Sequence, residues 1–188
     1  MIKIGITGSI SSGKTTASKI LSKKRGPLFS ADKEVKKLYQ NKNFQKKLIK
    51  TFKIKKKSNF KNILKNKILK KKIDIKKLEK IIHPRVRKKM LKFSRKNKNR
   101  KTLFYEIPLL IESKLMKFFD VIIFIKAKKK TRLKRLKSKG GDERLFTLMN
   151  RRQLSDLKKI KFCDHVVANE KNLSILKRNL LDIIKKYV

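Results

Sequence analysis

The chain has 188 residues, which suits one domain with room for an inserted sub-domain. Lys and Arg number 58 against 13 Asp and Glu, giving a net charge of +45, and the 39% of hydrophobic residues is enough for a core. The single cysteine, Cys163, excludes a disulfide framework and a thiolate metal cluster, and the longest purely apolar run, Val121 to Ile125, is too short to span a bilayer. We expect a cytoplasmic protein without a membrane partner, and favour a monomer.

The positive charge has two explanations. A polyanion such as a nucleic acid is the usual partner of a strongly basic chain. However, 47 of the basic residues are Lys, which together with 22 Ile and 11 Asn are types with A/T-rich codons, and the Lys are spread along the whole chain. We therefore favour genome base composition as the origin of the charge and expect no specific nucleic-acid partner.

The first third of the chain begins with an alternating unit of strand and helix. Lys3 to Thr7 alternates and is β-branched, which predicts a strand. Apolar residues then recur at helical spacing over 14–24, and Gly26 with Pro27 is expected to stop that helix. A second short strand leads to Asp32. This order is typical of the start of a doubly wound parallel sheet.

The rest of the chain predicts a long helical insert and a return to the sheet. The Lys-rich residues 33–100 are longer than a plain crossover needs and favour a helical sub-domain. Further strands are expected over 102–107, 120–125 and 164–169, with helices starting at 131, resuming over 142–154 and covering 173–187. The expected fold is α/β, with a parallel sheet of about five strands flanked by helices.

The stretch TGSISSGKTT carries a phosphate-binding motif. Gly8 is followed after four residues by Gly13, Lys14 and Thr15, and the motif stands between a strand and a helix. The glycines allow the backbone N–H groups to converge on phosphate oxygens at a helix N-terminus. Lys14 would reach the β- and γ-phosphates, and the Thr15 hydroxyl would bind Mg²⁺. The loop predicts a nucleoside triphosphate as ligand but does not identify the acceptor.

Acidic residues are few, so those at the ends of strands are informative. Asp32 follows the second strand, where it could orient and deprotonate an acceptor hydroxyl, or could serve as the N-cap of the next helix. Glu106 ends the third strand and could hold magnesium through water, or could be a plain strand-end charge. We favour catalysis for Asp32 and leave both alternatives open for Glu106.

His83 and Pro84 stand together inside the helical insert. The histidine could contact a ligand or be structural, and the proline could mark the start of a helix. Arg85 and Arg87 could pair with phosphates of an acceptor, although basic residues are frequent throughout this chain.

Taken in order, the motifs resemble those of the dephospho-coenzyme A kinase family, in the P-loop kinase superfamily. The matching stretches are GITGSISSGKTT, SAD, IIHPRVR, EIPLLIES, TRLKR, Gln153 and CDHVVAN, which run nearly end to end. The loop alone occurs in many kinases, whereas the ordered set is specific. The resemblance implies transfer of the ATP γ-phosphate to the 3′-hydroxyl of dephospho-CoA, by a P-loop kinase fold with a helical acceptor domain and a lid over 132–153.

The resemblance also assigns roles to residues. Asp32 matches the catalytic aspartate, and Lys14 and Arg135, at the lid base, would act on the phosphates. Asn169 would lie near the adenosine of ATP. The expected acceptor contacts are Asp32, His83, Arg87, Leu109 and Glu112, the expected ATP contacts are Gly8, Ser11, Ser12, Gly13, Lys14, Thr15, Thr16 and Asn169, and the expected Mg²⁺ ligands are Thr15 and Glu106.

Two positions depart from the family pattern. Ser30 stands where the family usually has an aspartate, which affects metal affinity if that acid helps to bind magnesium. Met149 stands where the family often has a lid arginine, so a neighbouring arginine would substitute for it. The alternatives to this family are another P-loop kinase for a nucleotide or small metabolite, and an ATP-using nucleic-acid-binding protein.

Overall fold

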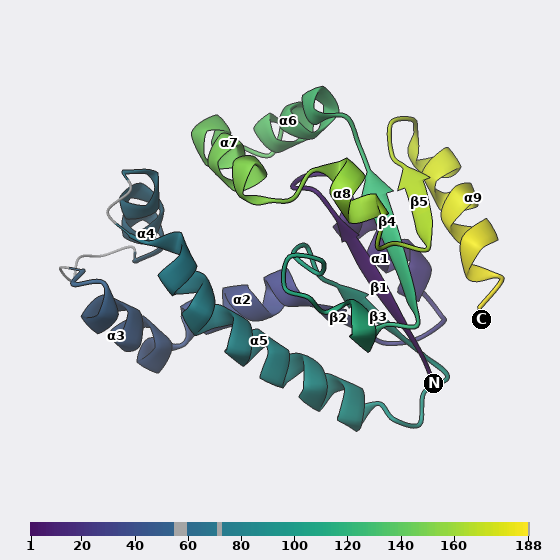
Figure 1. Ribbon diagram of the computed structural model, residues 1–188, viewed down its shortest axis with the longest axis horizontal. Coiled ribbons are helices and arrows are strands. Elements are labelled where there is room, and N and C mark those ends of the chain that lie inside the picture. Colours follow the sequence, from purple (N-terminus) through teal and green to yellow (C-terminus); the bar gives the residue numbers. More distant parts are fainter. Residues whose placement is uncertain (55–59, 71–72, 188) are drawn as a thin grey trace. The chain divides into compact units, whose positions relative to one another are not determined.

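The computed structural model describes residues 1–54, 60–70 and 73–187, which form two compact units. The first unit joins Met1–Ser30 to Phe93–Val188, and the second unit is Ala31–Lys92. The first unit contains the sheet, and the second is built from helices (Figure 1).

Five parallel strands form the sheet of the first unit, as predicted (Figure 1). Their order is β2 (Leu28–Ser30), β3 (Thr102–Glu106), β1 (Ile2–Gly8), β4 (Val121–Lys126) and β5 (His165–Ala168). Because all strands are parallel, their carboxyl ends meet at one edge, where ligands of open α/β sheets bind. The phosphate-binding loop follows β1 at this edge.

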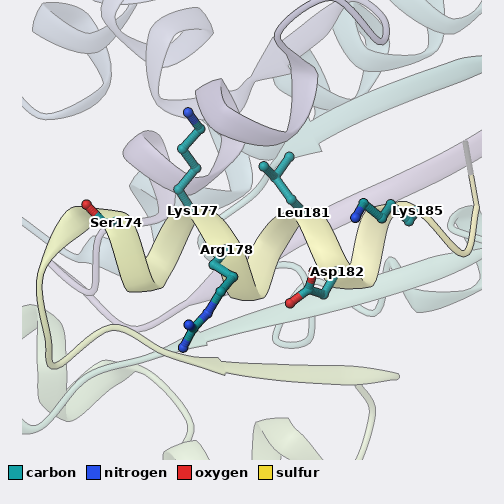
Figure 2. A pocket seen from close by; sticks show the side chains of 6 residues that line it. All are labelled: Ser174, Lys177, Arg178, Leu181, Asp182 and Lys185. Atoms are coloured by element: carbon teal, nitrogen blue, oxygen red, sulfur yellow. The ribbon is translucent and has the colours of Figure 1, made fainter.

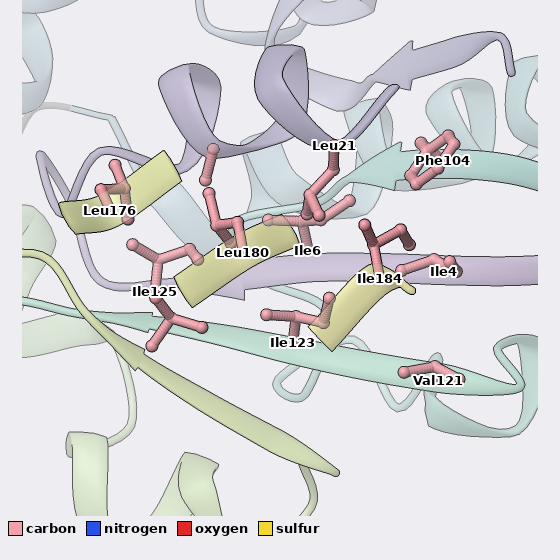
Figure 3. Packing of buried hydrophobic residues seen from close by; sticks show 12 residues of the cluster. Ile4, Ile6, Leu21, Phe104, Val121, Ile123, Ile125, Leu176, Leu180 and Ile184 are labelled. Carbon is pink, nitrogen blue, oxygen red and sulfur yellow. The ribbon is translucent and has the colours of Figure 1, made fainter. Parts of the chain in front are cut away.

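One face of the sheet packs against α1 (Lys14–Ser22) and α9 (Leu173–Ile184) (Figure 3). Leu21 and Leu180 are fully buried there, and each buried side chain of this size contributes about 1.5–3 kcal/mol. The other members of the cluster are Ile4, Ile6, Ala17, Phe104, Val121, Ile123, Ile125, Val167, Leu176 and Ile184. This core fixes α1, and therefore the loop that precedes it, against the centre of the sheet.

Helix α1 ends earlier than its sequence predicts. It stops at Ser22 rather than at Gly26, and Lys24 adopts a left-handed conformation with a φ of 61°. Gly26 serves a different purpose, because a Cβ there would lie 2.2 Å from the carbonyl oxygen of Thr102. The glycine thus allows a close approach to β3 and does not terminate the helix.

Three helices lie between β4 and β5. They are α6 (Lys129–Lys137), α7 (Glu143–Arg152) and α8 (Asp156–Ile160). Asp142 caps α7 by accepting from the backbone N–H groups of Arg144 and Leu145, and Ser155 caps α8 by accepting from that of Lys158. The expected helix over 142–154 is therefore shorter, because the chain leaves it at Arg152 and starts a new capped helix.

The second unit consists of α2 (Ala31–Gln40), α3 (Lys42–Thr51), α4 (Phe60–Leu69) and most of α5 (Ile75–Lys96). Its core includes Phe44, Leu48, Leu78 and Ile82. Pro84 lies inside α5 and not at its start, so this alternative from the sequence is wrong. The helix forms because Leu78, Ile82 and Met90 keep a buried stripe on both sides of the proline, which outweighs the one lost N–H donor.

Within the described ranges, every helix falls short of the length and apolar character that crossing a bilayer requires.

Candidate active site

The phosphate-binding loop has the backbone that its glycines predict. Gly8 and Gly13 have φ values of 151° and 99°, and Ser11 has a φ of 58°. A Cβ on Gly8 would lie 2.5 Å from the carbonyl oxygen of Ile125. Left-handed backbone next to right-handed backbone turns successive N–H groups toward one point, which makes a concave site for an anion.

Replacing Gly13 with Ala is expected to weaken ATP binding strongly. The left-handed φ costs an L-residue about 1–2 kcal/mol, and the new Cβ would lie 2.1 Å from Asn169 Nδ2. The measurement is MgATP affinity by calorimetry, with the thermal midpoint as a check on folding. Gly26→Ala is the matched control, because a Cβ there also meets a close backbone contact, 2.2 Å from the carbonyl oxygen of Thr102, but lies outside the phosphate-binding loop. Equal ATP affinities for the two variants would contradict the prediction.

Lys14 is buried and its ammonium donates to the carbonyl oxygen of Ser9 at 2.9 Å. The same carbonyl accepts from the backbone N–H of Ser12 at 3.1 Å. The side chain of Lys14 thus bends back over the loop that its backbone follows. This places a positive charge at the centre of the predicted phosphate site.

Thr15 and Glu106 are brought together by the sheet. The Thr15 hydroxyl donates to Glu106 Oε1 at 2.5 Å, and Glu106 is only 1% exposed. A hydroxyl and a carboxylate are the hard oxygen donors that Mg²⁺ accepts, and Mg²⁺ at phosphate sites uses only one or two protein groups besides water and phosphate. The pair therefore fits the ion. Among the described residues no group of three His, Cys, Asp or Glu offers a larger metal site.

Arg135 and Asn169 also lie at the loop. Asn169 Nδ2 donates to the carbonyl oxygen of Ser12 at 2.8 Å. Arg135 donates to the same carbonyl at 3.4 Å and to the carbonyl oxygen of Asn169 at 2.9 Å. Arg135, on α6, and Asn169, directly after β5, thus meet at the end of the loop that leads into α1.

Glu112 has protein partners of its own. Its Oε1 lies 2.8 Å from the ammonium of Lys159, which is fully buried, and accepts from the backbone N–H of Leu154 at 3.1 Å. The contact of Lys159 with Glu112 is an ion pair by distance and is not a hydrogen bond. Among the residues that the structure describes, neither Lys159 Nζ nor Glu112 Oε2 has a hydrogen-bond partner. Breaking such a pair would leave an uncompensated buried charge.

The thiol of Cys163 is expected to be unreactive in the folded protein. Burial, with a smaller effect of Asp164, raises its pKa from 9.0 to about 12, although Lys159 opposes the shift. Because the folded pKa is the higher one, the associated stability is complete below about pH 9 and is lost as the pH rises toward 12. At pH 8 we expect iodoacetamide to label the folded chain at least about tenfold more slowly than the urea-unfolded chain, since only the thiolate reacts. Equal rates would contradict this prediction.

The other predicted residues belong to the second unit or to the segment after β3. Asp32 is exposed and lies in the first turn of α2, which begins at Ala31, so the alternative that it is an N-cap is wrong. His83 and Arg87 lie four residues apart on α5, hence on one face of the helix. Leu109 follows β3 and is half-buried.

Three residues that contact the loop were assigned no role from the sequence. Arg132 and Gln153 bond to the backbone of Ile10, and Asp156 accepts from the Ser9 hydroxyl. Gln153 served only as a family marker. Asp156 could have been noticed as one of only 13 acids, but its spacing carries no signal.

A shallow hollow elsewhere in this unit shares no residue with the loop. It is lined by side chains of α9 and of the residue that follows it (Figure 2): Ser174, Lys177, Arg178, Leu181, Asp182 and Lys185. No residue predicted to be functional lies in it.

Comparison with known proteins assigns the chain to a family. Residues 2–174 match the family model described as dephospho-CoA kinase. The dephospho-CoA kinase of Rickettsia bellii is 32% identical over 191 residues, covering 98% of this chain and 96% of the relative. That of Fusobacterium nucleatum is 35% identical over 181 residues, covering 92% of each chain.

Solved structures agree in fold. The dephospho-CoA kinase from Campylobacter jejuni has a TM-score of 0.61 and 24% identity, covering 98% of this chain and 96% of its own. A structure from Thermus thermophilus has a TM-score of 0.79 and 23% identity, covering 100% of this chain and 98% of its own. The deoxyadenosine kinase from M. mycoides, with a TM-score of 0.56, 18% identity and coverage of 98% and 100%, shares the same P-loop kinase fold. The chain belongs to the dephospho-CoA kinase family.

Proposed function

We propose that this chain transfers the γ-phosphate of ATP to the 3′-hydroxyl of dephospho-CoA, giving CoA and ADP. The observation that carries the proposal is a complete phosphate-binding loop, with Lys14 folded over it and Thr15 beside Glu106, in a chain whose family is dephospho-CoA kinase. Such a site supplies the positioning and charge neutralisation that phosphoryl transfer needs.

The roles of the residues follow from their chemistry. Lys14 and Arg135 stabilise negative charge on the phosphates, and Asp32 accepts the proton of the attacking hydroxyl. Thr15 and Glu106 would hold Mg²⁺, which when bound would supply positive charge to offset that of the phosphates. The loop contacts to ATP are those of Gly8, Ser11, Ser12, Gly13 and Thr16, with Asn169 at the nucleoside side.

Acceptor binding is assigned to Asp32 together with His83, Arg87, Leu109 and Glu112. His83 and Arg87, on one face of α5, offer donors for the phosphates of the acceptor. The region 132–153, with Gly140 at its tip, would close over the ATP phosphates and exclude water, and its arginines would stand in for the family arginine absent at Met149.

Transfer to a different acceptor is the main alternative within the same fold. The neighbours include shikimate kinases and a deoxyadenosine kinase at 12–18% identity, a level that carries the fold but not the acceptor. Weak, salt-dependent binding to nucleic acid is expected of any chain of this charge and would not indicate a nucleic-acid function.

The test is release of ADP from ATP and Mg²⁺ at moderate salt, with dephospho-CoA, AMP, adenosine, shikimate or no acceptor. We expect release only with dephospho-CoA, with CoA as the product. Release of ADP with another acceptor would show that this chain phosphorylates that acceptor and not dephospho-CoA. No release from folded protein that still binds ATP would overturn the proposed activity. Titration of Mg²⁺ in the same assay would also show whether Ser30 weakens the use of the metal, by comparison with Ser30→Asp.

A further inference from the structure

The tip of the phosphate-binding loop, Ser9 and Ile10, is held by side chains from far along the chain. The backbone N–H of Ile10 donates to Gln153 Oε1 at 3.0 Å, and its carbonyl oxygen accepts from Arg132 Nη1 at 3.3 Å. The Ser9 hydroxyl donates to Asp156 Oδ1 at 2.5 Å. Both peptide groups of Ile10 are therefore directed at protein partners, which determines the direction in which the rest of the loop faces.

These contacts come from buried or half-buried groups with further anchors. Arg132 is 6% exposed and also donates to the carbonyl oxygen of Ala127 at 3.0 Å and to Asn150 Oδ1 at 2.8 Å. Its guanidinium stacks over the ring of Phe146, 5.7 Å from the centroid. Burial lowers the pKa of Arg132, an effect that the charge of Asp156 partly offsets. An anchored guanidinium can impose its geometry on a loop carbonyl.

The contact of Asp156 leads directly to the lysine of the site. Ser9 is 3% exposed, and its carbonyl oxygen is the acceptor for Lys14 Nζ. The hydrogen bond from the Ser9 side chain to Asp156 therefore also restrains the Ser9 carbonyl group, which accepts from Lys14. Asp156 itself is half-buried and lies in the first turn of α8, next to the N-cap Ser155.

We propose that Asp156, with Gln153 and Arg132, is a positioning residue for the phosphate-binding loop and Lys14. Arg132 and Gln153 are the two ends of the region 132–153 and both bond to Ile10, while Asp156, three residues after that region, bonds to Ser9. These contacts hold the loop in its phosphate-binding conformation before ATP binds. The inference rests on the proposed use of ATP by this loop, but not on the identity of the acceptor.

The direction in which ATP affinity changes distinguishes a positioning role of Asp156 from a purely electrostatic effect of its charge. Removing a carboxylate near the site should favour ATP electrostatically, because ATP is an anion. Asp156→Ala loses both the charge and the hydrogen-bond acceptor, whereas Asp156→Asn loses the charge and keeps the acceptor Oδ1. Positioning predicts weaker binding for the Ala variant only, and charge alone predicts tighter binding for both.

The experiment is calorimetric titration of the full chain with the Mg²⁺ complex of a non-hydrolysable ATP analogue. We expect Asp156→Ala to bind about fivefold more weakly, the size of one hydrogen bond, and Asp156→Asn to bind at least as tightly as the wild type. Ser9→Ala should bind at least as weakly as Asp156→Ala, because it loses the same hydrogen bond but keeps the carboxylate, and the double variant should resemble Asp156→Ala. Asp182→Ala, an exposed carboxylate on α9, is the charge-matched control and should leave affinity unchanged.

A second readout does not need nucleotide. Hydrogen exchange of peptides covering residues 8–16 in the free protein should be faster in Asp156→Ala and unchanged in Asp156→Asn. The inference is overturned if the Ala and Asn variants bind alike, if Asp156→Ala binds more tightly than the wild type, or if the wild type does not bind the analogue. If the variants show the expected pattern of binding affinities but the wild type makes no CoA, the proposed function is contradicted and the positioning role remains supported.

Discussion

Asp32→Asn is expected to lower kcat with dephospho-CoA by about 10²–10⁴-fold, while MgATP affinity changes little. The substitution keeps the shape and exposure of the side chain, but an amide cannot accept the proton of the attacking hydroxyl. The measurement is steady-state CoA formation together with calorimetric ATP binding.

Glu34→Gln is the matched control for this variant. Glu34 is in the same helical turn and loses the same charge, but its carboxylate is paired with Lys37 at 2.7 Å. We expect kcat of this control to stay within about twofold of the wild type, because the Glu34 carboxylate, on a side chain that is 17% exposed, already pairs with Lys37 and has no assigned part in proton transfer. A near-normal kcat in Asp32→Asn would remove Asp32 from the role of base, and equal losses in both variants would indicate an effect of charge on the helix.

Lys14→Met is expected to lower kcat/KM by at least about 10²–10³-fold, with weaker binding of ATP as well. Methionine preserves the length and much of the packing of a side chain that is 7% exposed, but it removes the charge that rests on the Ser9 carbonyl. The loss should be largest in kcat, because the lysine acts on charge that grows as the γ-phosphate is transferred.

Lys19→Met tests whether the effect is specific. Lys19 is an exposed lysine on the same helix, and its loss changes the net charge of the chain by the same amount. If general attraction of ATP by a highly basic protein dominated, the two variants would lose activity equally, and raised salt would reduce both losses. A difference that persists at moderate salt would assign the effect to the site, because salt screens exposed charges far more than buried ones.

Local patterns in the sequence were enough to predict the strands of the sheet and the phosphate-binding loop. The continuous apolar run of β4 and the alternation in β1 are properties of neighbouring residues, and so is the spacing from Gly8 to Thr15. Local patterns were less informative at helix ends. The first turn of α2 includes Asp32 and α5 continues through Pro84, because tertiary packing outweighs the weak local preference for a boundary.

Only the tertiary structure determined which distant groups meet at the loop. Thr15 and Glu106 are 91 residues apart, and Ser9 and Asp156 are 147 apart. Their contacts depend on the order β2-β3-β1-β4-β5, which brings the carboxyl ends of the strands together and returns α8 to the loop. No periodicity encodes that order, since it is decided by how the helices and strands bury their apolar faces against one another. The sequence by itself therefore determined the chemistry of the loop, while the packed sheet decided which acid, arginine and amide hold it in place.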